Sequence, residues 1–212
     1  MDFSLETVAL AVVPVVFAIA LHEAAHGYVA RMFGDQTAWM LGRVTLNPLK
    51  HIDPIGTVVV PGVLLLAGAP FLFGWAKPVP VNFGNLRQPK RDMIWVAGAG
   101  PAANLVMGMF WAMIAQLAMS DDVASEGLLR MAQIGISVNL VLMVLNLLPI
   151  PPLDGGRIAV GLLPERAGRA LSRVEPYGFI VILLLLVTGI LGDLMRPLLR
   201  AAAYLLSALT GL

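Results

Sequence analysis

The sequence contains no cysteine and few charged side chains. The absence of cysteine excludes a disulfide framework, a thiolate nucleophile and a cysteine-ligated metal site. Any metal ion must therefore be held by histidine, aspartate or glutamate. Charged residues make up only 13% of the chain, and 14 basic residues nearly balance 13 acidic ones. The basic residues are scattered between apolar runs, so nucleic-acid binding is not expected.

Polar surface of any kind is also scarce. Hydrophobic residues make up 58% of the 212 residues, and the mean hydropathy is +0.84. A water-soluble domain of this composition would have too little polar surface to remain in solution. The sequence therefore predicts an all-α polytopic protein embedded in a lipid bilayer. Residues 1–6 are acidic and no cleavage pattern follows, which predicts a retained first helix rather than a signal peptide.

Apolar runs and the residues that break them predict about five to six membrane segments. We expect helices over approximately residues 5–33, 93–119, 128–148 and 177–191, and a tilted or interfacial helix over 197–209. The run 54–73 holds six prolines and glycines, which indicates a re-entrant or broken segment. Short β-strand or hairpin elements on the cytoplasmic side are expected at residues 39–46 and 75–83.

Basic residues flank the broken run on both sides, around Arg43 before it and around Arg87 after it. Basic loops remain in the cytoplasm, so both flanks are expected there and the run 54–73 is expected not to cross the membrane. The same rule places the acidic loop at 121–126 outside and the basic stretch 157–173 inside.

The first predicted helix carries His22, Glu23 and His26 within apolar sequence. This His-Glu-Ala-Ala-His run fits the pattern H-E-x-x-H, in which two imidazoles four residues apart share one helix face and reach one metal ion. Glu23 lies beside them as a base for water. Each ionisable residue at membrane depth costs roughly 2.5 kcal/mol or more, which favours a metal site over a structural polar cluster.

A catalytic metal site usually has three protein ligands, and Asp154 is the best candidate for the third. It follows a helix-breaking, proline-rich stretch at residues 149–152 and precedes two glycines, a context that can turn a carboxylate inward. On the predicted topology it lies at the same depth as His22 and His26. Taken alone, Asp154 would be interpreted as a helix cap or turn residue, and the histidine pair reverses that interpretation.

Two further polar residues have competing interpretations. His51 is either a reserve ligand or interfacial gate, or a solvated loop histidine, and we favour the loop histidine and leave it out of the metal site. Asn104 lies within an apolar helix, where asparagine most often hydrogen-bonds between helices.

Three motifs together resemble the site-2 protease family of intramembrane zinc metalloproteases, peptidase family M50. They are the H-E-x-x-H run, Ala-Gly-Pro at residues 99–101, and Asn-Leu-Leu-Pro-Ile-Pro-Pro-Leu-Asp-Gly-Gly at residues 146–156. Their order and spacing are similar to the family pattern over residues 21–157. The last motif is long and specific, so chance agreement of all three is improbable.

The resemblance implies a role for each matched residue. His22, His26 and Asp154 would bind one Zn²⁺ per chain, and Glu23 would act as the general base. Asn146 would lie near the substrate or the developing oxyanion. The implied reaction is hydrolysis of peptide bonds within or next to transmembrane segments of membrane-protein substrates.

The resemblance is closest to the small bacterial and archaeal members, because no inserted PDZ domain fits between residues 33 and 154. It implies one metalloprotease domain over residues 1–212, with a catalytic core at about 5–163 and C-terminal membrane helices at about 176–210. Neither a preceding membrane helix nor a C-terminal nucleotide-binding module is expected. The implied location is the prokaryotic cell membrane, with the active site towards the cytoplasm. A homo-oligomer is left open.

Other functions use similar residues. Two histidines and a carboxylate also form the facial triad of non-haem iron oxygenases, but Glu23 between the histidines favours hydrolysis. The main alternative is a membrane metal-binding or zinc-transport protein that uses the same cluster without proteolysis. A transporter would need further polar residues in its other helices, and the sequence shows one cluster only.

Overall fold

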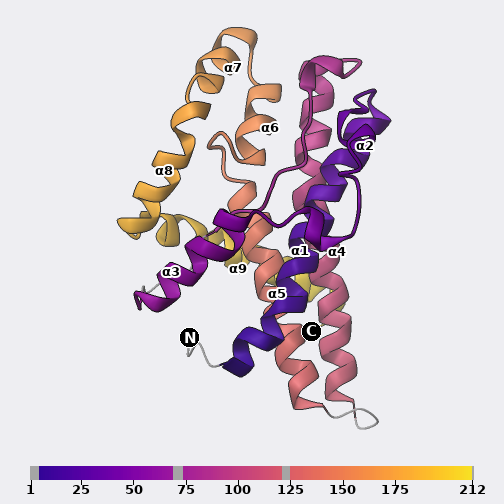
Figure 1. Cartoon of the computed structure of the whole chain (residues 1–212), viewed down its shortest axis with the longest axis vertical. Helices are drawn as coiled ribbons and strands as arrows, with labels where there is room; N and C mark the ends of the chain where they lie inside the picture. Colours follow the sequence, from indigo (N-terminus) through magenta and orange to yellow (C-terminus); the bar gives the residue numbers. More distant parts are fainter. Residues whose placement is uncertain (1–4, 69–73, 121–124, 212) are drawn as a thin grey trace.

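The computed structural model describes residues 5–68, 74–120 and 125–211 of the chain (Figure 1). Every regular element among these residues is helical. In chain order the elements are α1 (Leu5–Met32), α2 (Thr37–Met40), η1 (Pro48–Lys50), η2 (Pro54–Val59), α3 (Val60–Leu66), η3 (Phe83–Asn85), α4 (Pro89–Met119), α5 (Glu126–Asn146), α6 (Asp154–Leu162), α7 (Glu165–Ser172), α8 (Glu175–Val187) and α9 (Ile190–Thr210).

In the described residues three helices, α1, α4 and α5, are long and apolar enough to cross a membrane. A fourth span is possible if α7 and α8, which meet at a 64° bend, act as one. The polytopic helical architecture is therefore confirmed, but the expectation of five to six segments is not supported. The 13 residues of α8 span only about 20 Å, less than a bilayer core of about 30 Å. The helix α9 carries three charged residues, at positions 193, 196 and 200.

The expected β elements are also wrong. Residues 39–46 contain the end of α2 followed by turns, and residues 75–82 form an irregular segment without a strand ladder. In the second segment only isolated backbone bonds occur, from the N–H of Trp75 to Gly56 O at 3.0 Å and from the N–H of Lys77 to His51 O at 2.9 Å. The physical reason is that prolines at positions 78 and 80 remove the donors that a ladder needs.

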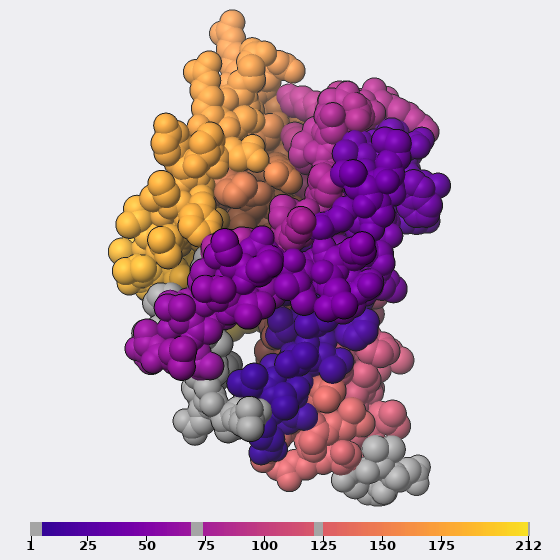
Figure 2. Space-filling model, viewed as in Figure 1, coloured from indigo at the N-terminus to yellow at the C-terminus, as the bar shows by residue number. Residues whose placement is uncertain are grey.

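These two backbone bonds bring the chain that follows the apolar run 54–73 back to the chain that precedes it. Its described part forms η2 and α3, a short apolar helical stretch over Pro54–Leu66. Residues 69–73 lie outside the described part, and residues 75–77 lie beside residues 51–57 again. Both ends of the run thus lie together, as in a re-entrant segment. In Figure 2 the purple stretch that contains α3 crosses the face of the molecule over the middle of α1.

The long helices pack through small residues. α4 contacts both α1 and α5, and the buried positions on α1 and α4 are mostly alanine and glycine. At Gly135 of α5, a Cβ atom would lie 2.4 Å from the ring of Trp111, so only glycine lets α4 approach this closely. This is the close packing that membrane helices achieve with small residues.

The ends of the long helices define two ends of the bundle. Arg130 near the start of α5 lies 3.4 Å from Glu6 near the start of α1, so these two helix starts lie at one end of the bundle. Figure 1 places α2, α6 and α7 at the opposite end, where α1 finishes and α4 begins. The acidic residues 121 and 122 of the predicted outer loop lie outside the described residues.

Candidate metal centre

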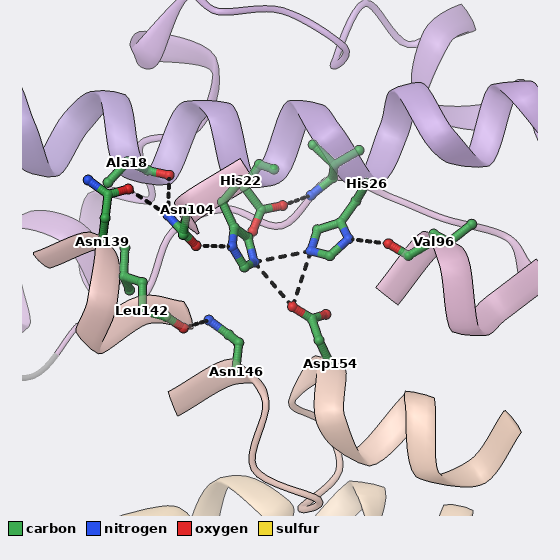
Figure 3. A network of polar contacts seen from close by, with 11 residues as sticks. Ala18, His22, His26, Val96, Asn104, Asn139, Leu142, Asn146 and Asp154 are labelled. Atoms are coloured by element: carbon green, nitrogen blue, oxygen red, sulfur yellow. Dashed lines mark hydrogen bonds and ion pairs between the residues drawn. The ribbon is translucent and has the colours of Figure 1, made fainter. Parts of the chain in front are cut away.

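Two turns of α1 and the first residue of α6 meet in the interior of the molecule (Figure 3). The Nε2 atoms of His22 and His26 are 3.1 Å apart. Asp154 Oδ2 lies 3.3 Å from each of them. These are the three residues that the sequence predicts as metal ligands, and among the described residues they form the one cluster of this kind.

The turn before α6 places the aspartate. α5 ends at Asn146, the chain doubles back over residues 147–153, and Asp154 begins α6. A Cβ on Gly155 would lie 2.2 Å from Leu147 O, and one on Gly156 would lie 2.3 Å from the Pro151 nitrogen. Both positions therefore require glycine, because the start of α6 packs directly against the backbone of this loop.

Gly100 of α4 gives the histidines their space. A Cβ atom there would lie 2.5 Å from His22 Cε1 and 2.5 Å from His26 Nε2. No real Cβ atom makes contacts that short, so any larger residue would displace the imidazoles. The Ala-Gly-Pro motif is therefore part of the site itself and does more than permit helix packing.

Hydrogen bonds fix which nitrogen of each ring carries the proton. His22 Nδ1 lies 2.6 Å from Asn104 Oδ1, and His26 Nδ1 lies 2.7 Å from Val96 O. Both partners are oxygen acceptors, so each Nδ1 carries hydrogen and donates it. In the neutral rings each Nε2 then presents a lone pair to the centre of the cluster.

This arrangement fits a bound cation. Two Nε2 lone pairs and a carboxylate oxygen converge, and the buried Asp154 Oδ2 has no hydrogen-bond partner in the part of the chain that the structure describes. Such a group of acceptors repels itself unless a positive charge lies among them. Tetrahedral zinc with bonds of about 2.0–2.2 Å separates its ligand atoms by roughly 3.3–3.6 Å, close to the observed spacings. Two imidazoles and one carboxylate also suit zinc chemically.

Glu23 lies next to the ligands without joining them. Its Oε2 accepts a hydrogen bond of 2.6 Å from the N–H of Val79, in the irregular segment 75–82. Two anchors hold that segment. The Nη2 atom of Arg43 donates to Lys77 O at 2.9 Å, and Asp35 Oδ2 accepts from the N–H of Asn82 at 2.7 Å. The segment thus lies against the carboxylate expected to act as base.

Asp35 is itself fully buried just beyond the end of α1. Burial alone would raise the pKa of this carboxyl, but hydrogen bonds from Thr37, Asn82 and Asn85 outweigh that effect and hold the pKa below its usual value. The aspartate therefore remains charged and keeps the segment attached to α1 at neutral pH.

The other sequence predictions have mixed outcomes. Asn146 donates from Nδ2 to Leu142 O at 2.9 Å and is partly buried, and α5 ends there instead of continuing to residue 148. His51 is only 2% exposed and lies 2.9 Å from Thr45 O, so the preferred interpretation as a solvated loop histidine is wrong. It does not join the ligand cluster.

Sequence reasoning missed three contacts of the site. The interhelical role expected of Asn104 is confirmed, but its bond to His22 was not expected, nor was the participation of Asn139. The available signal was the cost of an asparagine at membrane depth, which requires a partner for each one. The contact between Val79 and Glu23 has no sequence signal, since it uses only a backbone N–H.

Comparison with known proteins gives consistent results. Residues 111–189 match the family model described as Peptidase family M50. YwhC of Bacillus subtilis, which carries the name of a zinc metalloprotease, is 41% identical over 195 residues, covering 90% of this chain and 85% of that protein. Rip2 of Mycolicibacterium smegmatis, named likewise, is 34% identical over 179 residues, covering 80% of this chain and 63% of that protein. No solved structure matches the chain.

These matches favour the peptidase interpretation over metal transport, because the family is one of peptidases and the similarity to YwhC extends over most of both chains. The matched region of the family model also includes Asp154. Together with the arrangement of the two histidines and the aspartate, they establish that this chain belongs to peptidase family M50.

Proposed function

We propose that this membrane protein is an intramembrane zinc protease whose metal ligands are His22, His26 and Asp154. The observation that carries the proposal is the convergence of two histidine nitrogens and one carboxylate oxygen, all within 4.8 Å of one another, in a largely buried site. Glu23 adjoins this cluster on α1 and is the proposed general base. When bound, zinc lowers the pKa of water towards about 7 and polarises the scissile carbonyl.

The protein's own residues then carry the proton. Glu23 accepts a proton from the attacking water as the water oxygen bonds to the carbonyl carbon, and passes it to the amide nitrogen as the C–N bond breaks. The bond from Val79 to Oε2 orients the carboxylate and leaves its second oxygen for this proton. Asn146, near the end of α5, is the proposed contact for the substrate backbone or the developing oxyanion.

The proposed substrates are transmembrane proteins, cleaved within or beside their membrane segments. A helical segment hides its peptide bonds, so it must unwind locally before the carbonyl can reach the site. We assign the protein to a prokaryotic cell membrane, with the site towards the cytoplasm. The basic loops around Arg43 and Arg87 support this orientation.

The test is the substitution Glu23→Gln. Glutamine retains an oxygen that can accept from Val79 but cannot take up a proton. We expect full zinc content and an unchanged fold, with cleavage of a membrane-helix substrate in liposomes reduced on the order of 10²-fold or more. Zinc is measured on the same samples as cleavage.

A matched control is Glu6→Gln, which alters an exposed glutamate on the same helix and should leave cleavage unchanged. Undiminished cleavage by zinc-loaded Glu23→Gln would remove this residue from the mechanism. If the unaltered protein binds zinc but cleaves nothing in a broad panel of membrane-helix substrates, the protease assignment is wrong.

A further inference from the structure

Two asparagines lie buried where α1, α4 and α5 meet. Asn104 on α4 and Asn139 on α5 are both 0% exposed. Buried amides in a membrane protein are stable only when their polar atoms are paired, because no water is available to replace a lost bond. The hydrogen-bond partners of the two side chains therefore indicate the role of each asparagine.

The two amides form one directed chain of hydrogen bonds (Figure 3). Asn139 donates from Nδ2 to the backbone carbonyl of Gly135 at 2.8 Å, so its oxygen must face the other way. That oxygen accepts from Asn104 Nδ2 at 3.0 Å, and the same Nδ2 lies 3.3 Å from Ala18 O. Asn104 must then present its own oxygen to His22, whose Nδ1 is 2.6 Å away.

We infer that Asn104 is a positioning residue for the zinc ligand His22, and that Asn139 fixes the direction of the Asn104 amide. The carbonyl of Gly135 can only accept a hydrogen bond, so it fixes the orientation of the Asn139 amide. That amide fixes the orientation of Asn104, which in turn faces the His22 ring with its oxygen. The chain requires a proton on Nδ1 of His22, which in the neutral ring leaves Nε2 with its lone pair free for a metal ion. Outer partners of this kind typically change metal affinity by about 10–100-fold. This inference rests on the proposed metal site.

His26 provides a comparison within the same protein. Its Nδ1 lies 2.7 Å from a backbone carbonyl, that of Val96, and needs no side chain to set its direction. A change at Asn104 should therefore alter His22 and leave His26 as it was. A general loosening of the helix packing would alter both rings.

The experiment uses the small number of histidines. The chain has three, at positions 22, 26 and 51, so protein labelled with ¹⁵N in histidine gives three sets of ring signals by NMR in detergent micelles. In zinc-loaded Asn104→Ala, we expect a changed Nδ1 signal for His22 alone. Zinc affinity, measured by chelator competition at fixed pH, should fall by about 10–100-fold.

Two further variants separate positioning from folding. Asn104→Asp keeps an oxygen that accepts from His22 but loses the donor to Asn139, so its zinc affinity should lie much closer to the unaltered protein than that of the alanine variant. Asn139→Ala should weaken zinc binding less than Asn104→Ala. The double alanine variant should match Asn104→Ala, because the chain is already broken there.

Several outcomes overturn the inference. They are an unchanged zinc affinity in folded Asn104→Ala, equal changes in the signals of His22 and His26, or losses in the double variant that equal the product of the single losses. If Asn104→Ala does not fold, zinc affinity is compared between Asn104→Asp and Asn139→Ala. Unchanged zinc affinity in both folded variants would then overturn the inference. Failure of the unaltered protein to bind zinc would contradict the proposed metal site instead, so the two failures are distinguishable.

Discussion

Asp154 presents a buried carboxylate oxygen that makes no hydrogen bond to any described residue and lies equally far from two imidazole nitrogens. Such an atom would be costly to bury without a cation. We therefore expect Asp154→Ala to lower zinc affinity as much as His22→Ala or His26→Ala. The loss should exceed the roughly 10–100-fold that is typical of outer hydrogen-bond partners. Metal analysis after equilibrium dialysis provides the measurement.

His51→Ala is the control for that experiment, because His51 is the third histidine and lies outside the ligand cluster. It should retain zinc. Full zinc retention by Asp154→Ala, together with zinc loss in His51→Ala, would show that His51 and not Asp154 is the third ligand.

Asn146 has a different expected behaviour, since its amide donates within its own helix and reaches none of the three ligands. Asn146→Leu should slow cleavage while leaving zinc bound, because it removes the proposed polar contact to the substrate backbone and no proposed contact to the metal. A loss of about 10²-fold in turnover would be typical of a missing oxyanion donor. An unchanged rate would leave Asn146 with a role in helix packing only.

Among the elements, α4 contributes to the site through the absence of a side chain. Gly100→Ala should abolish tight zinc binding, because the added methyl group overlaps both imidazoles. Gly98→Ala, half a turn away, is a matched control, since a Cβ at that position meets no atom of the described residues within 4 Å. Thermal unfolding should distinguish a lost site from a lost fold. Equal zinc binding by the two variants would show that α4 can move away from α1 without harm.

The sequence predicts the long helices well and the irregular segments poorly. α1, α4 and α5 occupy the expected apolar runs to within a few residues, because an uninterrupted apolar stretch in a membrane has no other way to pair its backbone. Residues 75–83 look extended from their prolines, but whether an extended segment joins a sheet depends on a neighbouring strand. The described residues offer none.

The candidate site also has a part that the sequence predicts and a part that it does not. His22, Glu23, His26 and Asp154 are recognisable because metal chemistry demands particular residue types at particular spacings. The hydrogen bonds that orient them depend on where α4 and α5 cross α1. No local pattern encodes that crossing, so the partners of the ligands become visible only in three dimensions.

For the whole molecule, the proximity of the two ends of the run 54–73 predicts a membrane topology. The loops around Arg43 and Arg87 should lie on one side of the membrane, and the start of α5 on the other. The absence of native cysteine allows Lys50→Cys, Gln88→Cys and Gly127→Cys to be tested singly with an impermeant thiol reagent. The first two should react from the same face and the third from the opposite one. Reaction of positions 50 and 88 from opposite faces would rule out re-entry.

The proposed metal ligands also come from distant parts of the chain, α1 and the first residue of α6. A chain synthesised only as far as α3 holds His22 and His26 but lacks the wall that Gly100 of α4 forms beside the rings. A chain synthesised as far as α5 has this wall but still lacks Asp154. Hydrolytic competence therefore appears late in biosynthesis. While it is being inserted beside other nascent membrane helices, the growing protein cannot yet cut them.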